Sequence, residues 1–412
     1  RVCIVGGGFG GLYTALNLAK LKPLRRGEPA PEVTVIDTND RFVFLPMLYE
    51  LVTGELQDWE VAPVFTDLLA GTGVKFVQGT VVGRDRSNKT VTVQLASVEG
   101  GGETEIQYDD LVVALGSEST IESVTGAADN ALPFFRVRDA VRLREKLAQT
   151  LVKKNGKAKV FVVGGGYSGV EIACNLAEYE GGKLDISLVH RGDKVMEMGQ
   201  GFNRNTGVLK LIDKGVNALM RTSVQSVGNG TITLKDPEGE VKEEECDICV
   251  WTAGVRASKT ASLLGFKTSD SGRIKVSPRL KVVGEEGVYA VGDIADCDDA
   301  LRSRMAGTAQ VALQQADTVA WNIHADMSGG VPINFRYMNL GEMLTLGANS
   351  GSVASELLGL QVQGPAAHAL RRLTYLIRMP TTQHKAKVLG SWVQRLPSDI
   401  ARFVPRLSRE AK

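Results

Sequence analysis

The sequence contains one strand-turn-helix pattern written twice. The stretch RVCIVGGGFGGLYTALNLA runs from Arg1 to Ala19, and KVFVVGGGYSGVEIACNLA runs from Lys159 to Ala177. In each copy a short apolar, β-branched run breaks into G-x-G-x-x-G, and apolar residues then resume at helical spacing. A single motif of this kind is weak evidence, but two copies predict two nucleotide-binding units in one chain.

Each glycine of the motif has its own physical reason. The first turns the chain, the second lets the backbone approach a pyrophosphate, and the third lets the helix pack against the strand. The phosphates then lie at the N-terminus of the helix. The residues predicted to bind the nucleotides are Gly6, Gly8, Phe9, Gly10 and Gly11 in the first copy, and Gly164, Gly166 and Gly169 in the second.

The strand that follows each motif ends in a different kind of residue. The first ends in Asp37, whereas the second ends in His190 and Arg191. An acidic residue there, roughly 20 positions beyond the glycines, accepts hydrogen bonds from ribose hydroxyls and repels a 2′-phosphate, whereas a guanidinium pairs with that phosphate. We therefore expect Asp37 to bind an unphosphorylated ribose, and His190 and Arg191 to favour NADPH over NADH. Asp193 could instead neutralise the arginine or bind the ribose itself.

The length and the repeat together indicate an α/β fold with two Rossmann-like domains. A chain of 412 residues is too long for one ordinary hydrophobic core. The apolar strand at 287–293 lacks a third glycine motif, so we expect it to complete the first domain and leave the second as an insertion. The expected domains are 1–155 with 276–350, the inserted 156–275, and a C-terminal region at 351–412.

Composition excludes several classes of protein. A net charge of +1 argues against general nucleic-acid binding. The sequence contains no run of 18 apolar residues, so we expect no membrane-spanning helix. Cys246 and Cys249 have a suggestive spacing, but they lie in an apolar strand, which favours packing over a zinc or redox pair. We expect no metal site, and the cysteine usage favours a reducing compartment.

The C-terminal stretch from 364 to 412 differs from the rest of the chain. It carries ten lysine and arginine residues against two acidic residues, interleaved with leucine, isoleucine, valine and aromatic residues. A basic amphipathic segment of this kind predicts binding to a membrane or lipid-droplet surface. A solvated helical tail or a homodimer contact is the alternative interpretation.

Taken together, the motifs resemble those of the type II NAD(P)H:quinone dehydrogenases, which are flavoproteins with two dinucleotide-binding domains. The resemblance extends over nearly the whole chain. Its carriers are Phe44 to Tyr49, Gly164 to Glu171, Trp251 to Val255, Gly292 and Asp293, and Ala309 to Gln315. Within the family the chain is most similar to the plastid and cyanobacterial C-type group, and LTYLIRMP at 373–380 supports that placement.

The resemblance implies FAD in the first unit and NAD(P)H in the second. It places Asp293 at the ribityl chain of FAD, although a helix cap is an alternative role for this residue. Further residues that we assign to cofactor binding are Arg41, Gly116, Gly254 and Gly292.

The resemblance also implies the catalytic residues. Glu171 would lie beside the nicotinamide and the flavin, although a first-turn glutamate is also favoured by the helix dipole alone. Gln310 and Gln314 would face the quinone.

The implied activity is reduction of plastoquinone or demethylphylloquinone, without proton pumping. Its implied place is the chloroplast, at a plastoglobule or thylakoid surface, or a cyanobacterial membrane surface. Two alternatives remain at this stage: a soluble FAD reductase that passes electrons to ferredoxin or another protein, and a flavoprotein whose redox state controls an interaction.

Overall fold

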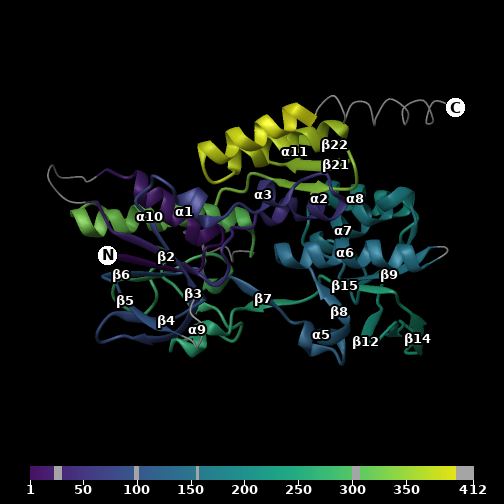
Figure 1. Ribbon diagram of the computed structural model, residues 1–412, viewed down its shortest axis with the longest axis horizontal. Coiled ribbons are helices and arrows are strands. Elements are labelled where there is room, and N and C mark those ends of the chain that lie inside the picture. The colour runs from purple at the N-terminus through teal and green to yellow at the C-terminus, as the bar shows by residue number, and fades with distance from the viewer. Residues whose placement is uncertain (23–29, 97–101, 155–156, 299–306, 396–412) are drawn as a thin grey trace.

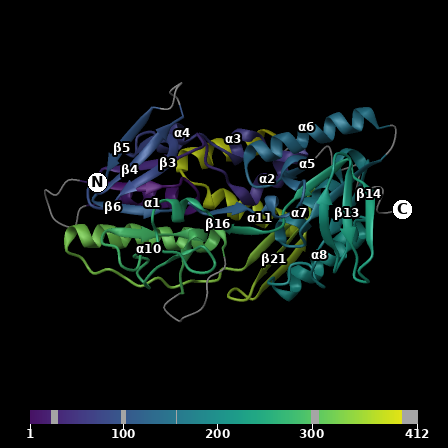
Figure 2. The same cartoon turned by 90° about the horizontal axis from the view of Figure 1, so that it is seen from below.

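The computed structural model describes residues 1–22, 30–96, 102–154, 157–298 and 307–395. Figures 1 and 2 show an elongated molecule with one α/β domain towards each end of its long axis. A third, C-terminal module lies beside α2 (Leu48–Thr53) and α8 (Gly201–Asp213) in Figure 1.

The first domain is built on a seven-stranded sheet with the order β18-β6-β1-β2-β3-β4-β5. The strands from β18 to β3 are parallel, and β4 and β5 extend the sheet in antiparallel pairing. Their bounds are β1 (Val2–Val5), β2 (Val33–Asp37), β3 (Lys75–Asp85), β4 (Thr90–Leu95), β5 (Glu103–Gln107), β6 (Asp110–Val113) and β18 (Val288–Ala290). The pairing of β18 with β6 confirms that the chain returns to complete this domain.

Two long helices pack against each other in the first domain, as Figure 2 shows. These are α1 (Phe9–Lys20) and α10 (Ala309–Ser328), joined by a hydrogen bond of 2.6 Å from Asn17 to Asp317. Helix α10 begins at Thr308, whose hydroxyl accepts a hydrogen bond from the Val311 amide, and ends at the left-handed Gly329. These two end signals set where the helix begins and ends.

The second domain is a five-stranded parallel sheet with the order β11-β10-β9-β15-β8. Its strands are β8 (Ala131–Pro133), β9 (Ala158–Val163), β10 (Leu184–Val189), β11 (Asn217–Leu219) and β15 (Ile248–Trp251). The helices α6 (Val137–Lys153), α7 (Tyr167–Ala177) and α8 belong to it, with an antiparallel sheet of β12 (Ser223–Val227), β13 (Thr231–Lys235) and β14 (Val241–Glu245).

The chain crosses between the domains at two paired segments. Strand β7 (Ser117–Ser119) leaves the first domain and pairs in antiparallel fashion with β16 (Val255–Ala257), which returns to it. The expected boundary at 155 and 156 needs correction because β8, which precedes it, pairs with β15 of the second sheet. The inserted part of the chain thus lies between the two connector strands.

The C-terminal module is a three-stranded antiparallel sheet covered by a helix. Its elements are β20 (Glu342–Thr345), β21 (Gly351–Ser355), β22 (Leu360–Gly364) and α11 (Pro365–Arg378), and residues 382–395 form a further helix. We expected the C-terminal region to begin at residue 351, but the module begins earlier, at β20. Among the described residues, no helix is both long enough and apolar enough to cross a bilayer. The tail residues Arg402, Arg406, Arg409 and Lys412 lie outside the described residues.

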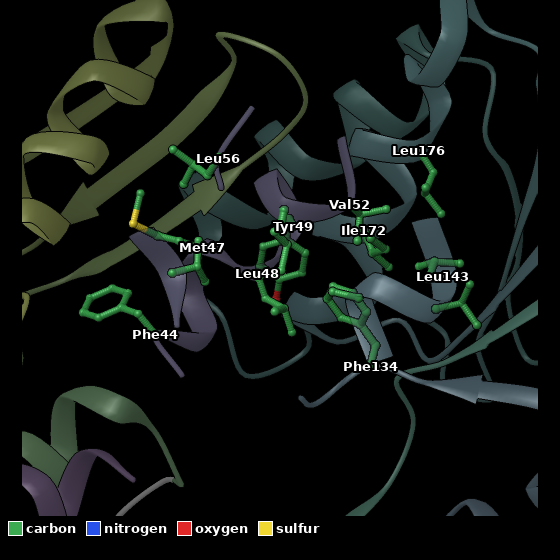
Figure 3. Packing of buried hydrophobic residues seen from close by; sticks show 14 of the residues in the cluster. Phe44, Met47, Leu48, Tyr49, Val52, Leu56, Phe134, Leu143, Ile172 and Leu176 are labelled. Atoms are coloured by element: carbon green, nitrogen blue, oxygen red, sulfur yellow. The ribbon is translucent and has the colours of Figure 1, made fainter. Parts of the chain in front are cut away.

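One hydrophobic cluster joins all three parts of the molecule. The apolar passage at 42–49 lies at its centre, where Met47, Leu48 and Tyr49 pack beside residues of α6 and α7 (Figure 3). The cluster also includes Leu376 and Val388 of the C-terminal module. The module is therefore part of the folded core.

The remaining short elements complete the connections. They are η1 (Leu45–Met47), α3 (Asp58–Val61), α4 (Phe65–Leu69), η2 (Ile121–Ser123), α5 (Ala127–Asn130), η3 (Tyr179–Gly181), α9 (Thr260–Leu263), β17 (Ile274–Lys275), η4 (Gly292–Ile294) and β19 (Ala295–Asp296).

Candidate active site

The two glycine motifs adopt the same backbone geometry. Their first glycines, Gly6 and Gly164, have φ angles of +103° and +117°, which residues with a side chain rarely adopt. A Cβ atom at Gly11 would lie 1.8 Å from the Gly6 carbonyl oxygen, and one at Gly169 would lie 1.6 Å from the Gly164 oxygen. The turn and the packing of the protein itself therefore require the first and third glycines.

The middle glycines, Gly8 and Gly166, are different. They cap the N-termini of α1 and α7 with φ angles of −69° and −75°, which any residue can adopt. A Cβ atom at either position would have no atom of the described residues within 4 Å, apart from its chain neighbours. Packing does not explain glycine here, whereas a pyrophosphate that approaches the helix N-terminus does. Both loops thus fit the phosphates of a dinucleotide.

Asp37 and His190 occupy equivalent places in the two units. The Asp37 carboxylate accepts a hydrogen bond of 2.7 Å from the Gly7 amide, and His190 Nδ1 accepts one of 3.1 Å from the Gly165 amide. The second unit thus replaces a carboxylate with an imidazole, which removes the negative charge that repels a 2′-phosphate.

The carboxyl ends of the parallel strands gather the other predicted cofactor residues. Ligands of open α/β sheets bind at this edge. In the first sheet, Gly6 follows β1, Asp37 ends β2, Gly116 follows β6, and Gly292 and Asp293 follow β18. In the second sheet, Gly254 follows β15. The fold therefore brings these residues to two edges, one in each domain.

Three predicted cofactor residues have contacts within the protein. Asp293 accepts a hydrogen bond of 2.8 Å from Ser117 Oγ, and no side-chain cap is formed at its short helix. Arg41 Nη1 donates to the Ala62 carbonyl oxygen at 3.0 Å. Phe9 is buried among aromatic rings. Cofactor binding by these three side chains stays a prediction.

Glu171 lies where α7 meets α2 and the C-terminal module. It is only 7% exposed, its Oε1 accepts a hydrogen bond of 3.0 Å from the Thr345 amide, and Tyr49 donates to the same carboxyl. Burial raises the pKa of Glu171 to about 7, against the lowering effect of the Arg371 guanidinium. A carboxyl with this pKa can take up or release a proton near neutral pH.

Gln310 and Gln314 bind the backbone of one segment, 337–341. Gln310 Oε1 accepts from the Leu340 amide at 2.9 Å and from Tyr337 Oη at 2.8 Å, and its Nε2 donates to the Gly341 carbonyl at 3.1 Å. Gln314 makes a paired contact with the amide and carbonyl of Met338, at 2.9 and 2.8 Å. Both side chains hold this segment against α10, and a contact with quinone stays a prediction.

The segment from 337 to 345 links the three predicted catalytic residues. Its first part is held by Gln310 and Gln314, and its last residue, Thr345, donates its amide proton to Glu171. Sequence analysis did not single out this segment, because its residues carry no motif and their partners are distant in the chain.

Sequence analysis also missed a buried ion pair beside Glu171. Arg371, which we counted with the surface charges of the tail, is 0% exposed and pairs with Glu50 at 2.5 Å. Its Nη2 donates to the Pro46 carbonyl at 2.6 Å. Arg371 lies four residues from both Ala367 and Tyr375, which places it on the packed face of α11. This four-residue spacing is the signal in the sequence that could have predicted the burial of Arg371.

Two further arginines of the tail are paired with the same part of the first domain. Arg372 lies 3.2 Å from Glu55, and Arg395 pairs with Glu60. The prediction of a free basic tail therefore needs correction for these residues, because their charges are neutralised by the acidic side chains of α2, α3 and the loop between them.

Comparison with known proteins identifies the family. Residues 1–316 match the pyridine nucleotide-disulphide oxidoreductases. The chain belongs to this family.

Two similar proteins indicate to which type of pyridine nucleotide-disulphide oxidoreductase the chain belongs. The chain is 39% identical over 406 residues to the demethylphylloquinone reductase NdbB of Synechocystis sp., covering 97% of this chain and 98% of that protein. It is 37% identical over 427 residues to the Arabidopsis thaliana alternative NAD(P)H-ubiquinone oxidoreductase C1, chloroplastic/mitochondrial, covering 97% and 81%. These relatives confirm the predicted type II NAD(P)H:quinone dehydrogenase, and the chain is an oxidoreductase enzyme.

A solved structure supports the fold independently. NDH2 from Plasmodium falciparum in complex with NADH matches with a TM-score of 0.82 at 16% identity, covering 96% of this chain and 97% of that one. At this identity the match shows the shared fold alone.

Proposed function

We propose that this oxidoreductase transfers two electrons from NADPH to a membrane quinone by way of FAD. The observation that carries this proposal is the pair of glycine loops, each open at its middle glycine, together with the buried Glu171 in the helix that begins at the second loop. When bound, FAD supplies the chemistry: it accepts a hydride from the nicotinamide and returns two electrons to the acceptor. The two loops hold the two dinucleotides, and Glu171 holds or releases a proton near them.

The relatives support the quinone as acceptor. The Synechocystis protein is named for demethylphylloquinone and the Arabidopsis protein for ubiquinone. We propose a plastoquinone or demethylphylloquinone for this chain, at a chloroplast or cyanobacterial membrane surface. A steady-state assay tests this: NADPH oxidation should depend on a soluble quinone. Oxidation that depends instead on ferredoxin, with none on quinone, would favour the soluble reductase.

Preference for NADPH rests on the end of β10. Arg191 and Lys194 are exposed there, and neither forms an ion pair in the part of the chain that the structure describes. His190 in place of a carboxylate leaves these cations available to a 2′-phosphate.

The substitution Arg191→Ala should therefore raise the KM for NADPH and leave that for NADH nearly unchanged. One charge-assisted hydrogen bond contributes about 1.5–3 kcal/mol, which corresponds to a change of roughly tenfold to a hundredfold. Initial rates with each coenzyme measure the effect, and NADH is the internal control. An equal rise in KM for both coenzymes, or a preference of the wild type for NADH, would contradict the assignment of Arg191 to the 2′-phosphate.

Gln310 is proposed to act in the step that reduces the quinone. The substitution Gln310→Leu should slow reoxidation of the reduced enzyme by quinone at least about tenfold and leave reduction by NADPH intact. The leucine side chain cannot form the hydrogen bonds of Gln310 to segment 337–341 and to the quinone. Loss of one or two of these bonds corresponds to the expected tenfold effect. Tyr337→Phe is the matched control, because it removes one hydrogen bond from Gln310 and keeps the amide. Slower reduction with unchanged reoxidation would contradict the assignment.

We also propose that the C-terminal helices bind a membrane surface. Two pairs of exposed apolar residues, each four positions apart, lie on them: Leu373 with Ile377 and Leu389 with Val393, from 48% to 60% exposed. Arg378 and Lys387 are exposed beside them. Apolar residues flanked by cations suit the interface of an anionic bilayer.

Replacing these four apolar residues with glutamine should lower binding to anionic liposomes at least about tenfold, because each buried aliphatic side chain contributes on the order of 1.5–3 kcal/mol when fully inserted. Vesicle co-sedimentation measures the change. Leu209→Gln with Ile212→Gln on α8 is the control, since both side chains are exposed apolar residues in another part of the molecule. Equal binding by the two variants would show that the C-terminal surface is not the contact.

A further inference from the structure

We propose that the buried ion pair of Arg371 and Glu50 is a positioning pair that fixes the charge and the placement of Glu171 in the active site. This inference rests on the proposed function, which gives Glu171 its role. It assigns the C-terminal helix a part in catalysis, in addition to any contact with a membrane.

The burial of the pair is the first observation. Arg371 and Glu50 side chains are 0% and 1% exposed, and they join α11 to α2 across more than 300 residues of sequence. Desolvation offsets most of the attraction in such a pair, so that apolar residues of similar volume stabilise a fold as well or better. Stability alone therefore does not account for two charges at this place.

The incomplete hydrogen bonding of the pair is the second observation. Arg371 donates Nη1 to Glu50 and Nη2 to Pro46, and its guanidinium lies 5.0 Å from the centre of the Tyr375 ring. Glu50 Oε2 and Arg371 Nε have no hydrogen-bond partner among the described residues. Both charges thus act in a dry environment, where electrostatic effects on a neighbour are large.

The position of Glu171 is the third observation. Tyr49 directly precedes Glu50 in α2 and donates to the Glu171 carboxyl, so neighbouring residues of one helix hold the ion pair and this hydrogen bond. The two charges act on the same carboxyl in opposite directions, since Arg371 lowers the pKa of Glu171 and Glu50 raises it.

The tyrosine and cysteine side chains around Glu171 have raised pKa values. Burial raises the pKa of Tyr49 and of Tyr375, which face the carboxyl from α2 and α11. Burial also raises the pKa of Tyr167 and of Cys174, which lie on α7 itself. Beyond burial and two hydrogen bonds, the charges of Arg371 and Glu50 are the ones that shift the pKa of Glu171 most.

The test measures the ionisation of Glu171 directly in the full-length protein. Infrared difference spectra recorded from pH 5 to 9 report the protonated carboxyl, and Glu171→Gln identifies its band. Glu50→Gln removes the charge that raises the pKa, so the midpoint should fall by about one pH unit. Arg371→Met combined with Glu50→Gln removes both charges without leaving either one buried alone. Because the effect of Arg371 is the larger, this midpoint should rise.

Arg371→Lys is the conservative control, because it keeps the charge and should leave the midpoint near that of the wild type. A purely structural pair would shift no midpoint, or would shift it in the same direction in both variants, and either result would overturn the proposal. The pH profile of flavin reduction by NADPH should follow the infrared midpoints. Opposite infrared shifts in a protein that fails to reduce quinone would uphold the positioning pair and reject the proposed acceptor.

Discussion

The substitution Gly166→Ala should abolish reduction by NADPH in a folded protein that still contains FAD, and Gly8→Ala should prevent FAD binding. Both positions have ordinary backbone angles, and in the described part of the chain no atom lies within 4 Å of an added Cβ, so the apoprotein should fold normally. The added methyl group would occupy the space in which the pyrophosphate approaches the helix. Loss of two charge-assisted hydrogen bonds, about 1.5–3 kcal/mol each, corresponds to at least a roughly hundredfold weaker binding.

Flavin absorbance and coenzyme titration measure these two effects separately. The third glycines provide the contrast: Gly11→Ala and Gly169→Ala would place a Cβ within 2 Å of a carbonyl oxygen, so these proteins should be destabilised whichever nucleotide is present. A Gly166→Ala protein that NADPH reduces at the wild-type rate would contradict the proposed location of the coenzyme. Loss of FAD from that protein would contradict the assignment of the two loops to two different dinucleotides.

Removal of residues 364–412 should unfold the protein, and not simply detach it from membranes. The truncation takes away Arg371, Arg372 and Arg395, the cations that pair with Glu50, Glu55 and Glu60, and Glu50 and Glu60 are buried in the whole protein. A buried charge left unpaired costs about 3–5 kcal/mol. Two such charges cost as much as the whole stability of an ordinary domain, which is about 5–15 kcal/mol.

The midpoint of chemical unfolding and the amount of FAD that stays bound to the protein measure this effect. The glutamine variant of the four exposed apolar residues is the matched control, because it alters the same helices and keeps all three ion pairs. Its unfolding midpoint should match that of the wild type. If the truncated protein unfolds at the wild-type midpoint, the C-terminal module is an appended anchor and the buried pairs contribute little.

The parts of the site predicted from sequence depend on local signals. Gly6, Gly8 and Gly11 are identified by spacing, because a turn, a phosphate contact and a packing contact follow one another within six residues. Comparison of the two copies placed Asp37 opposite His190, and matching hydrogen bonds from the two loops confirm that correspondence.

The parts that sequence did not predict depend on contacts between distant segments. Strand β8 was assigned to the first domain because its three residues carry no motif, and only its pairing with β15 places it in the second. Arg371 was counted as a surface charge because lysine and arginine are rarely buried without a partner, and its partner Glu50 lies 321 positions away. Sequence composition cannot distinguish a paired arginine from a free one.

The central claim is that the two nucleotide sites and the acceptor form one electron path. Anaerobic stopped-flow spectrophotometry of the FAD-loaded wild type tests it most directly: NADPH is mixed first, and a soluble quinone second. The account predicts that NADPH bleaches the flavin absorbance and that quinone restores it in an amount equal to the electrons supplied. Bleaching by NADPH without recovery on adding quinone would contradict it.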